Sequence, residues 1–164
     1  MSRTEPLRLP ALDPSTLPEA RTTLYPEPLK RRVAGRIRRK LGDACGLSKF
    51  GVNLVTLDPG SESALRHWHT REDEFVYVLE GEVVLISNAG EQTLRAGDCA
   101  GYPAGKNDGH HFVNRSGKPA RYLEIGNRDD DDVSSYPDDD LQWIKGVADG
   151  KQTLAPAHKN GKPY

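Results

Sequence analysis

The sequence predicts an all-β fold, a sandwich or barrel built from short strands. Between residues 49 and 127, short apolar runs follow one another at hairpin spacing. In the first of them Phe50, Val52 and Leu54 alternate with other residues, which is typical of a half-buried strand. Turn-forming groups such as Glu-Gly-Glu, Asn-Ala-Gly and Ser-Gly-Lys-Pro separate the runs. Regular short strands without a helical period indicate a sandwich or barrel.

The expected strands can be placed from these runs and turns. The first covers residues 49–57 and ends at an Asp-Pro-Gly turn. The others are expected at residues 65–70, 74–80, 82–88, 91–95, 98–102, 110–114 and 120–126. The chain therefore divides into an extended proline-rich and basic arm (1–34), a barrel (35–127), and an acidic loop with a C-terminal tail packed on the barrel (128–164).

The arm carries prolines at positions 6, 10, 14, 18, 26 and 28, a density that excludes helix and central strand. Such an arm is either disordered or laid against a partner subunit. From Lys30 to Lys40 the chain is basic. A DNA-binding patch is one interpretation, but no helix-turn-helix accompanies it, and a solvated face paired with the acidic C-terminal segment is favoured.

The acidic segment contains two aspartate runs, Asp129–Asp132 and Asp138–Asp140. A calcium site is one interpretation, but the glycine and glutamate spacing of an EF-hand loop is absent, so a solvated acidic loop is favoured. Trp143 and Ile144 are expected to anchor the tail on the barrel, and the remainder of the tail is expected to be irregular.

Composition limits the partners and the compartment. The chain has 164 residues, enough for one domain, and a net charge of −1, which favours neither nucleic acid nor an anionic membrane. Its apolar runs are far shorter than the roughly twenty residues that span a bilayer, and its start lacks a signal peptide. A cytoplasmic protein is expected. Cys45 and Cys99 are expected to be reduced structural thiols rather than a disulfide, although a role for Cys99 near the pocket stays open.

Histidines and a carboxylate are spaced for metal binding. His67 and His69 are two residues apart, so on a strand both imidazoles project from one face. Glu74 opens the next apolar run, and a histidine pair near residue 110 would supply a third imidazole. Three imidazoles and one carboxylate bind a divalent first-row metal and leave one or two coordination positions open.

At these residues the sequence resembles the cupin family. The first cupin motif is matched by Gly60, His67, His69, Glu74 and Gly81, and the second by Gly97, Pro103, Gly105, His110 and Asn114. Two spacings depart from the motifs: six residues rather than five follow Gly60, and four rather than two follow Gly105. Both additions fall in expected loops, where extra length costs little.

The resemblance covers residues 47–127 and implies a double-stranded β-helix, or jelly-roll, barrel with an extended N-terminal arm and an irregular C-terminal tail. It also implies a homodimer in which sheets or N-terminal arms pack across the interface. The metal ligands that it implies are His67, His69, Glu74 and His110. One divalent ion is expected, with Zn, Fe, Mn and Ni all compatible.

Some alternatives remain open. His110 is preferred to His111 because three residues separate it from Asn114, and Asp73 is the rival to Glu74. Polar groups that could orient a ligand inside the barrel are Tyr77, Tyr102, Arg66, Arg95 and Arg121. Tyr102 could serve as an acid or base in a lyase or isomerase, but a packing role is favoured and no catalytic residue is assigned.

Two classes of function fit these features. In the first, the protein is a metal-dependent enzyme on a small polar metabolite, an isomerase or epimerase on a sugar or an iron-dependent dioxygenase. In the second, the barrel binds a sugar or organic acid without catalysis and works as a sensor or accessory module. The complete ligand set favours the enzyme, because a pure binding module has no need of an open metal position.

Overall fold

The computed structural model describes residues 7–149 and 151–164 of the chain. Its strands are β1 (Arg36–Lys40), β2 (Phe50–Leu57), β3 (Trp68–His69), β4 (Glu74–Glu80), β5 (Glu82–Ser87), β6 (Gly90–Arg95), β7 (Cys99–Tyr102), β8 (His111–Val113), β9 (Ala120–Asn127), β10 (Ser134–Ser135), β11 (Gln142–Ala148) and β12 (Lys151–Ala157). The helical elements are short: η1 (Pro14–Thr16), η2 (Leu29–Val33) and α1 (Leu41–Ala44). The all-β fold expected from the sequence is confirmed.

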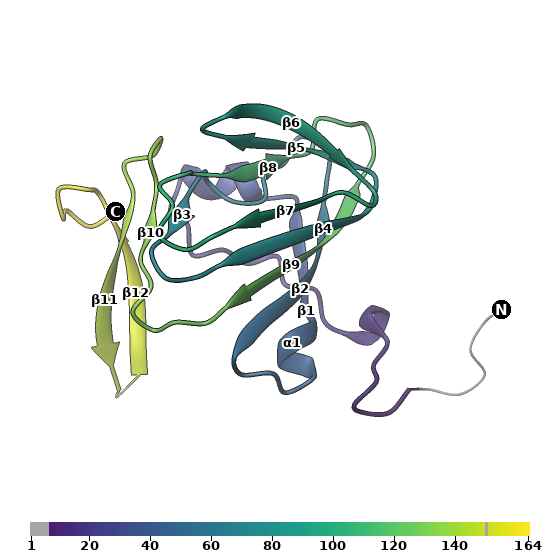
Figure 1. The fold of residues 1–164 in the computed structure, drawn as a ribbon. Helices are drawn as coiled ribbons and strands as arrows, with labels where there is room; N and C mark the ends of the chain where they lie inside the picture. Colours follow the sequence, from purple (N-terminus) through teal and green to yellow (C-terminus); the bar gives the residue numbers. More distant parts are fainter. Residues whose placement is uncertain (1–6, 150) are drawn as a thin grey trace.

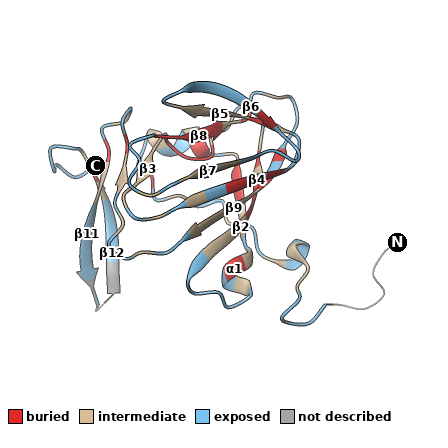
Figure 2. Ribbon diagram, in the orientation of Figure 1, coloured by how far each residue is buried: buried red, intermediate tan, exposed pale blue. Residues whose placement is uncertain are grey.

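Two antiparallel sheets enclose the main core (Figure 1). One sheet has five strands in the order β1-β2-β9-β4-β7, and the other has three strands in the order β6-β5-β8. Strands of both sheets carry buried residues (Figure 2), and these residues pack together in one cluster. The main core consists of Val55, Leu57, Val76, Val78, Val83, Leu85, Leu94, Phe112, Ala120 and Tyr122. Their burial follows from the alternation of side chains along each strand.

Inward-facing positions of the five-stranded sheet change from apolar to polar along the barrel. Strand pairing places Val55, Tyr122 and Val78 in one inward row, and all three are fully buried. The next row contains Asn53 and Glu124, beside Val76 of β4. The last inward row is Gly51, Gly126, Glu74 and Tyr102. One end of the barrel is therefore filled by apolar side chains. At the other end, polar side chains face the interior of the barrel.

A second hydrophobic cluster joins the two ends of the chain to the barrel. Tyr25 of the arm stacks on Trp143 with ring centroids 6.0 Å apart, and Trp143 Nε1 donates a hydrogen bond of 2.8 Å to Tyr136 Oη. Leu65 and Leu141 are buried in the same cluster. The arm around Tyr25 is thus packed on the barrel of the same chain, where neither of the two expected states had placed it, because these aromatic rings provide an apolar surface. The expected homodimer stays a prediction.

The basic run is not the solvated face that the sequence favoured. Residues 36–40 form β1, an edge strand of the five-stranded sheet, and Arg36 and Ile37 are buried there. The expected pairing with the acidic segment is confirmed at Arg32, whose guanidinium binds Asp139 at 2.8 Å and Glu62 at 2.8 Å. The prediction failed because β1 pairs with β2 across its full length, which turns alternate arginines inward.

The C-terminal tail is not irregular. Strands β11 and β12 form an antiparallel hairpin, and Asp149 at its turn has a φ of 51°. Asp149 is followed by glycine in the sequence, a pair that favours tight hairpin turns. Trp143 anchors this hairpin as expected, whereas Ile144 is 45% exposed because it projects from the opposite face of β11.

The two cysteines are free, as expected, but they are exposed rather than structural. Within the described residues, no helix is long and apolar enough to cross a membrane.

Two leucines test the inward and outward faces of the sheet with the same substitution. Leu57 is 0% exposed and Leu79 is 44% exposed. Leu57→Ala is expected to lower the free energy of unfolding by about 2–5 kcal/mol, because it leaves a cavity in a packed core. Leu79→Ala is expected to change it by less than about 0.5 kcal/mol. Urea denaturation of both variants measures the difference, and equal losses would contradict the assigned faces.

Candidate metal centre

Three histidines meet at the polar end of the barrel because of local strand pairing. His67 and His110 face each other in an antiparallel bridge, in which each backbone N–H donates to the carbonyl of the other at 3.2 and 2.8 Å. His69 lies two residues on, in β3, so its ring projects beside that of His67, with centroids 4.9 Å apart. Glu74 is the first residue of β4, and it faces the same interior.

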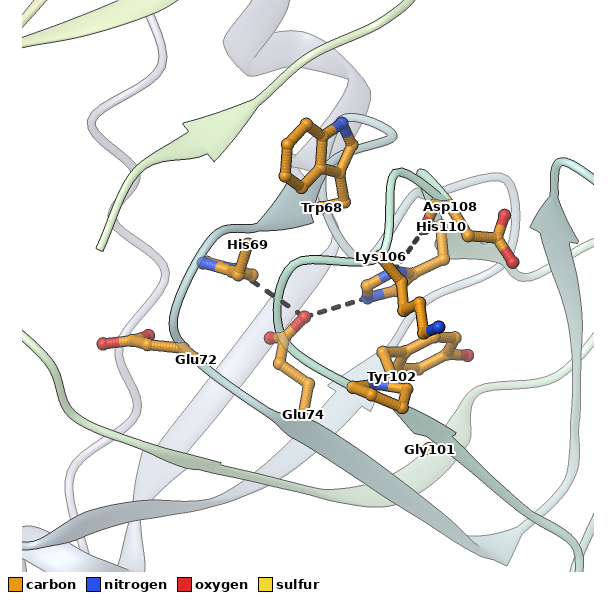
Figure 3. Close-up of a pocket in the computed structure, with 10 residues that line it drawn as sticks. Trp68, His69, Glu72, Glu74, Gly101, Tyr102, Lys106, Asp108 and His110 are labelled. Carbon is orange, nitrogen blue, oxygen red and sulfur yellow. Dashed lines mark hydrogen bonds and ion pairs between the residues drawn. The ribbon is translucent and has the colours of Figure 1, made fainter.

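The Nε2 atoms of the three imidazoles converge on one carboxylate oxygen. Glu74 Oε2 lies 2.9 Å from Nε2 of His110, 3.7 Å from that of His69 and 3.9 Å from that of His67. The candidate ligand atoms of His67, His69 and Glu74 all lie within 4.8 Å of one another. Figure 3 shows Glu74 between His69 and His110. The structure thus brings together all four residues expected from the sequence.

The opposite ring nitrogens face protein acceptors. Nδ1 of His67 lies 2.8 Å from the carbonyl oxygen of Leu65, and Nδ1 of His110 lies 3.3 Å from that of Asp108. Nδ1 of His69 lies 2.6 Å from Asp132 Oδ2. A hydrogen on Nδ1 of His67 and His69 satisfies these acceptors and leaves their Nε2 lone pairs directed at the cluster. Metal-binding histidines adopt this tautomer when outer partners orient them. His110 differs, because its Nε2 donates a hydrogen bond of 2.9 Å to Glu74 Oε2.

Asp132 is the functional residue that sequence reasoning missed. Its side chain is only 8% exposed, and its Oδ1 accepts hydrogen bonds from the Arg71 backbone N–H at 2.7 Å and Thr70 Oγ1 at 3.2 Å. The expectation of a solvated acidic loop is therefore wrong at this position. Pairing of β10 with β3 brings the loop to His69. No sequence motif relates residues 69 and 132, so this contact could not be predicted from the sequence.

The electrostatics favour a neutral His67 beside an ionised Glu74. For His69, burial alone would lower the pKa, but Glu74 and Asp132 outweigh burial and raise the pKa. Burial lowers the pKa of His67 to about 4 despite the attraction of Glu74, so this ring is neutral at neutral pH. Burial alone would raise the pKa of Glu74, but the hydrogen bond from His110 and the neighbouring imidazoles lower it to about 2. Neutral imidazoles and an ionised carboxylate are the forms that bind a metal.

The two rival residues lie elsewhere. Nδ1 of His111 faces the carbonyl oxygen of Ala64 at 3.0 Å and Glu62 Oε2 at 3.3 Å, because adjacent residues of a strand point to opposite sides. Asp73 Oδ1 accepts a hydrogen bond of 2.7 Å from the backbone N–H of Ala104. Neither joins the cluster of His67, His69, Glu74 and His110.

A cavity of about 210 Å³ opens beside the cluster (Figure 3). It is lined by Trp68, His69, Glu72, Glu74, Gly101, Tyr102, Pro103, Lys106, Asp108 and His110. The ring of Tyr102 stacks on that of His110 with centroids 3.4 Å apart and an interplanar angle of 1°. Burial raises the pKa of Tyr102 well above its usual value, so its hydroxyl stays protonated. That hydroxyl is buried without a hydrogen-bond partner among the described residues.

The other expected orienting groups lie outside this cavity. Tyr77 is 39% exposed, and Arg66, Arg95 and Arg121 form ion pairs with Asp138, Glu82 and Glu80. Only Tyr102 of that set lines the cavity. The inward-facing arginines come instead from β1, a strand that sequence reasoning did not assign.

The donor set fits a divalent transition metal. Three imidazole nitrogens and one carboxylate oxygen are ligands that Zn, Fe, Mn and Ni accept. The adjoining cavity leaves room for a further ligand on the side of His69, Glu74 and His110. A centre built this way can polarise a bound carbonyl or hydroxyl group.

Comparison with known proteins identifies the family. The family model for the cupin domain matches residues 53–126. A solved structure from Silicibacter pomeroyi, described as a sugar phosphate isomerase from a cupin superfamily, shares 41% identity with a TM-score of 0.85, and the match covers 94% of this chain and 96% of that one. A protein from Acidithiobacillus ferrooxidans, provisionally named a sugar phosphate isomerase, shares 33% identity with a TM-score of 0.65 over 74% of this chain and 77% of that one.

More distant structures share the fold alone. The polyketide cyclase RemF from Streptomyces resistomycificus is 21% identical, with a TM-score of 0.58 over 71% of this chain and 78% of that one. No curated protein matches the chain. The motif residues, the two facing sheets and the likeness over nearly the full length of both chains agree: this chain belongs to the cupin superfamily.

Proposed function

We propose that the protein is a metal-dependent isomerase of a small sugar-type metabolite, with His67, His69, Glu74 and His110 as the metal ligands. The observation that carries the proposal is the convergence of three Nε2 atoms on Glu74 Oε2, at 2.9, 3.7 and 3.9 Å. On each ring, Nδ1 faces an acceptor that fixes the orientation of the ring. Four potential metal ligands oriented in this way suit the binding of a metal ion, whereas the packing of a core does not require them.

A bound divalent ion would act as a Lewis acid that polarises the substrate carbonyl, which is the chemistry that an aldose–ketose interconversion needs. The residues of the chain bind and orient the substrate around that point. Trp68 and Tyr102 give the cavity apolar walls, and the carboxylates of Glu72 and Asp108 line it as acceptors for substrate hydroxyl groups. Such a cavity suits a small, hydroxyl-rich molecule.

The comparisons favour an isomerase over the dioxygenase alternative. The two structures that share 41% and 33% identity with this chain both carry sugar phosphate isomerase names. Their names support the proposal, and the metal centre gives it a chemical basis. The non-catalytic binding module remains the competing class, and the activity test below separates the two.

The adjacent histidines offer a matched test of the ligand set. His110→Gln is expected to weaken zinc binding by at least about tenfold, because it removes an imidazole from the cluster. His111→Gln is expected to leave zinc affinity within about twofold of wild type, because its ring faces Glu62 and Ala64. Competition against a fluorescent chelator, with protein purified without a histidine tag, measures both affinities.

Thermal unfolding of each variant without metal shows whether it folds. Weakening by His111→Gln alone, with His110→Gln still binding tightly, would reverse the assignment. Wild-type protein that binds none of Zn, Fe, Mn and Ni would remove the metal centre altogether.

The activity is tested by reconstitution. Metal-free protein loaded in turn with Fe(II), Mn, Ni or Zn is assayed for interconversion of aldose and ketose phosphates and for oxygen uptake. Turnover of a sugar phosphate is expected with at least one ion, and Glu74→Gln is expected to lower kcat/KM by at least about 100-fold.

The matched control is Glu91→Gln, which changes an exposed carboxylate paired with Arg115 far from the cluster. Oxygen uptake in place of isomerisation would establish the dioxygenase. Thermal stabilisation by sugar phosphates without turnover, under every metal, would establish the binding module.

A further inference from the structure

One inward-facing arginine, whose side chain lines a cavity shared with polar residues of the barrel, has no ion-pair partner among the described residues. Arg38 lies in β1 opposite Val55, and directly opposed residues of paired strands share a face of the sheet. Val55 is 0% exposed in the main core, so Arg38 projects into the barrel as well. The sequence had placed this residue in a solvated basic run.

The neighbouring arginines are all engaged. Arg36 donates a hydrogen bond of 2.6 Å to the carbonyl oxygen of Ser63, Arg39 binds Glu19 at 2.7 Å, and Arg32 binds Glu62 and Asp139. The guanidinium of Arg38 makes no hydrogen bond or ion pair with a side chain in the described part of the chain. Its Nε is buried and unpartnered. Arg38 as a whole is half-buried, so the desolvated and unpaired Nε is the costly part of the group, and it points to a missing acceptor.

The nearest carboxylate is held by another residue. Glu124 is close enough to favour the charged form of Arg38, but its Oε1 accepts a hydrogen bond of 3.0 Å from Asn53 Nδ2. Burial lowers the pKa of Arg38, although a guanidinium remains charged at neutral pH. Glu124 attracts Arg38 electrostatically but makes no hydrogen bond or ion pair with it among the described residues, so the unpartnered Nε–H of Arg38 is left to bind an anion.

A cavity lies between Arg38 and Glu74, one residue of the candidate metal centre. It measures about 260 Å³ and is lined by Arg38, Lys40, Asp43, Gly51, Asn53, Glu72, Glu74, Glu124, Gly126, Asn127 and Arg128. Gly51 and Gly126 occupy inward positions in the same row as Glu74 and add no side chain of their own to the space between β2, β9 and β4. At the rim, Lys40 and Arg128 are both paired with Asp43, which leaves Arg38 as the unpaired cation of the described residues that line this cavity.

We propose that Arg38 binds an anionic group of the substrate, a phosphate or a carboxylate, while the reacting end of the same molecule lies at Glu74 and the three histidines. This inference rests on the proposed function and adds to it a substrate class and a specificity-determining residue. A guanidinium can bind two oxygens of such a group at once. A neutral sugar would leave Arg38 unpaired, so the site discriminates against it.

Lys106 is the competing anchor. It lines the cavity shown in Figure 3, at the outer mouth, and its side chain is exposed. An exposed, flexible lysine loses much of its attraction to solvent screening, whereas Arg38 is half-buried and its backbone is held in β1. The anion is therefore assigned to the cavity lined by Arg38 and Glu74.

Three non-reacting probes of equal chain length test this assignment. Arabinitol 5-phosphate, arabinonate and arabinitol are titrated by calorimetry into zinc-loaded protein. Wild type is expected to bind one of the two anions about 10- to 100-fold more tightly than arabinitol. Arg38→Gln is expected to abolish that preference, Arg38→Lys to retain part of it, and Lys106→Gln to leave it unchanged. The preferred anion shows whether the group is a phosphate or a carboxylate.

Zinc content and thermal unfolding confirm that each variant is folded and loaded. Loss of the preference in Lys106→Gln but not in Arg38→Gln would overturn the assignment and leave the proposed function standing. Equal binding of all three probes by wild type would overturn the anion site while leaving an isomerase of neutral sugars. No binding of any probe by zinc-loaded wild type would overturn both proposals.

Discussion

The convergence of three imidazole nitrogens on one carboxylate oxygen is the interaction on which the proposed function depends. Glu74 and the histidines occupy the end of the barrel where inward side chains become polar. Burying such groups is costly unless each has a partner, and here each does: carbonyl oxygens or Asp132 on the outer side, Glu74 on the inner. The apolar rows around Val55 and Tyr122 hold the strands in register and so fix these positions.

Much of the barrel and the clustering of the four candidate ligands could be predicted from the sequence, because both depend on local patterns. Apolar runs placed the strands from β2 to β9, although not β1, and each turn signal lay between two of them. Strand parity also predicted that His67 and His69 share a face, and the spacing to Asn114 favoured His110 over His111. These inferences need only the two-residue period of a strand.

The remaining features depend on contacts between distant segments, which no local pattern encodes. Asp132 reaches His69 because β10 pairs with β3, and Tyr25 reaches Trp143 across most of the chain. Arg38 is one of several basic residues in a run, and the run itself does not show which of them point inward. The inward direction of Arg38 follows only from its pairing with Val55. The C-terminal hairpin is different, since the sequence pair Asp-Gly at positions 149 and 150 is a local turn signal between the two paired strands, and the expectation of an irregular tail gave it no weight.

The central claim is that one metal ion is held by three imidazoles and a carboxylate. X-ray absorption spectroscopy of zinc-loaded wild-type protein tests it most directly, because the spectrum reports the ligands of the metal itself. The account predicts a first shell of nitrogen and oxygen at about 2.0–2.2 Å with the outer-shell scattering of about three imidazole rings. A sulfur scatterer at about 2.3 Å, or scattering from no more than one imidazole, would contradict it.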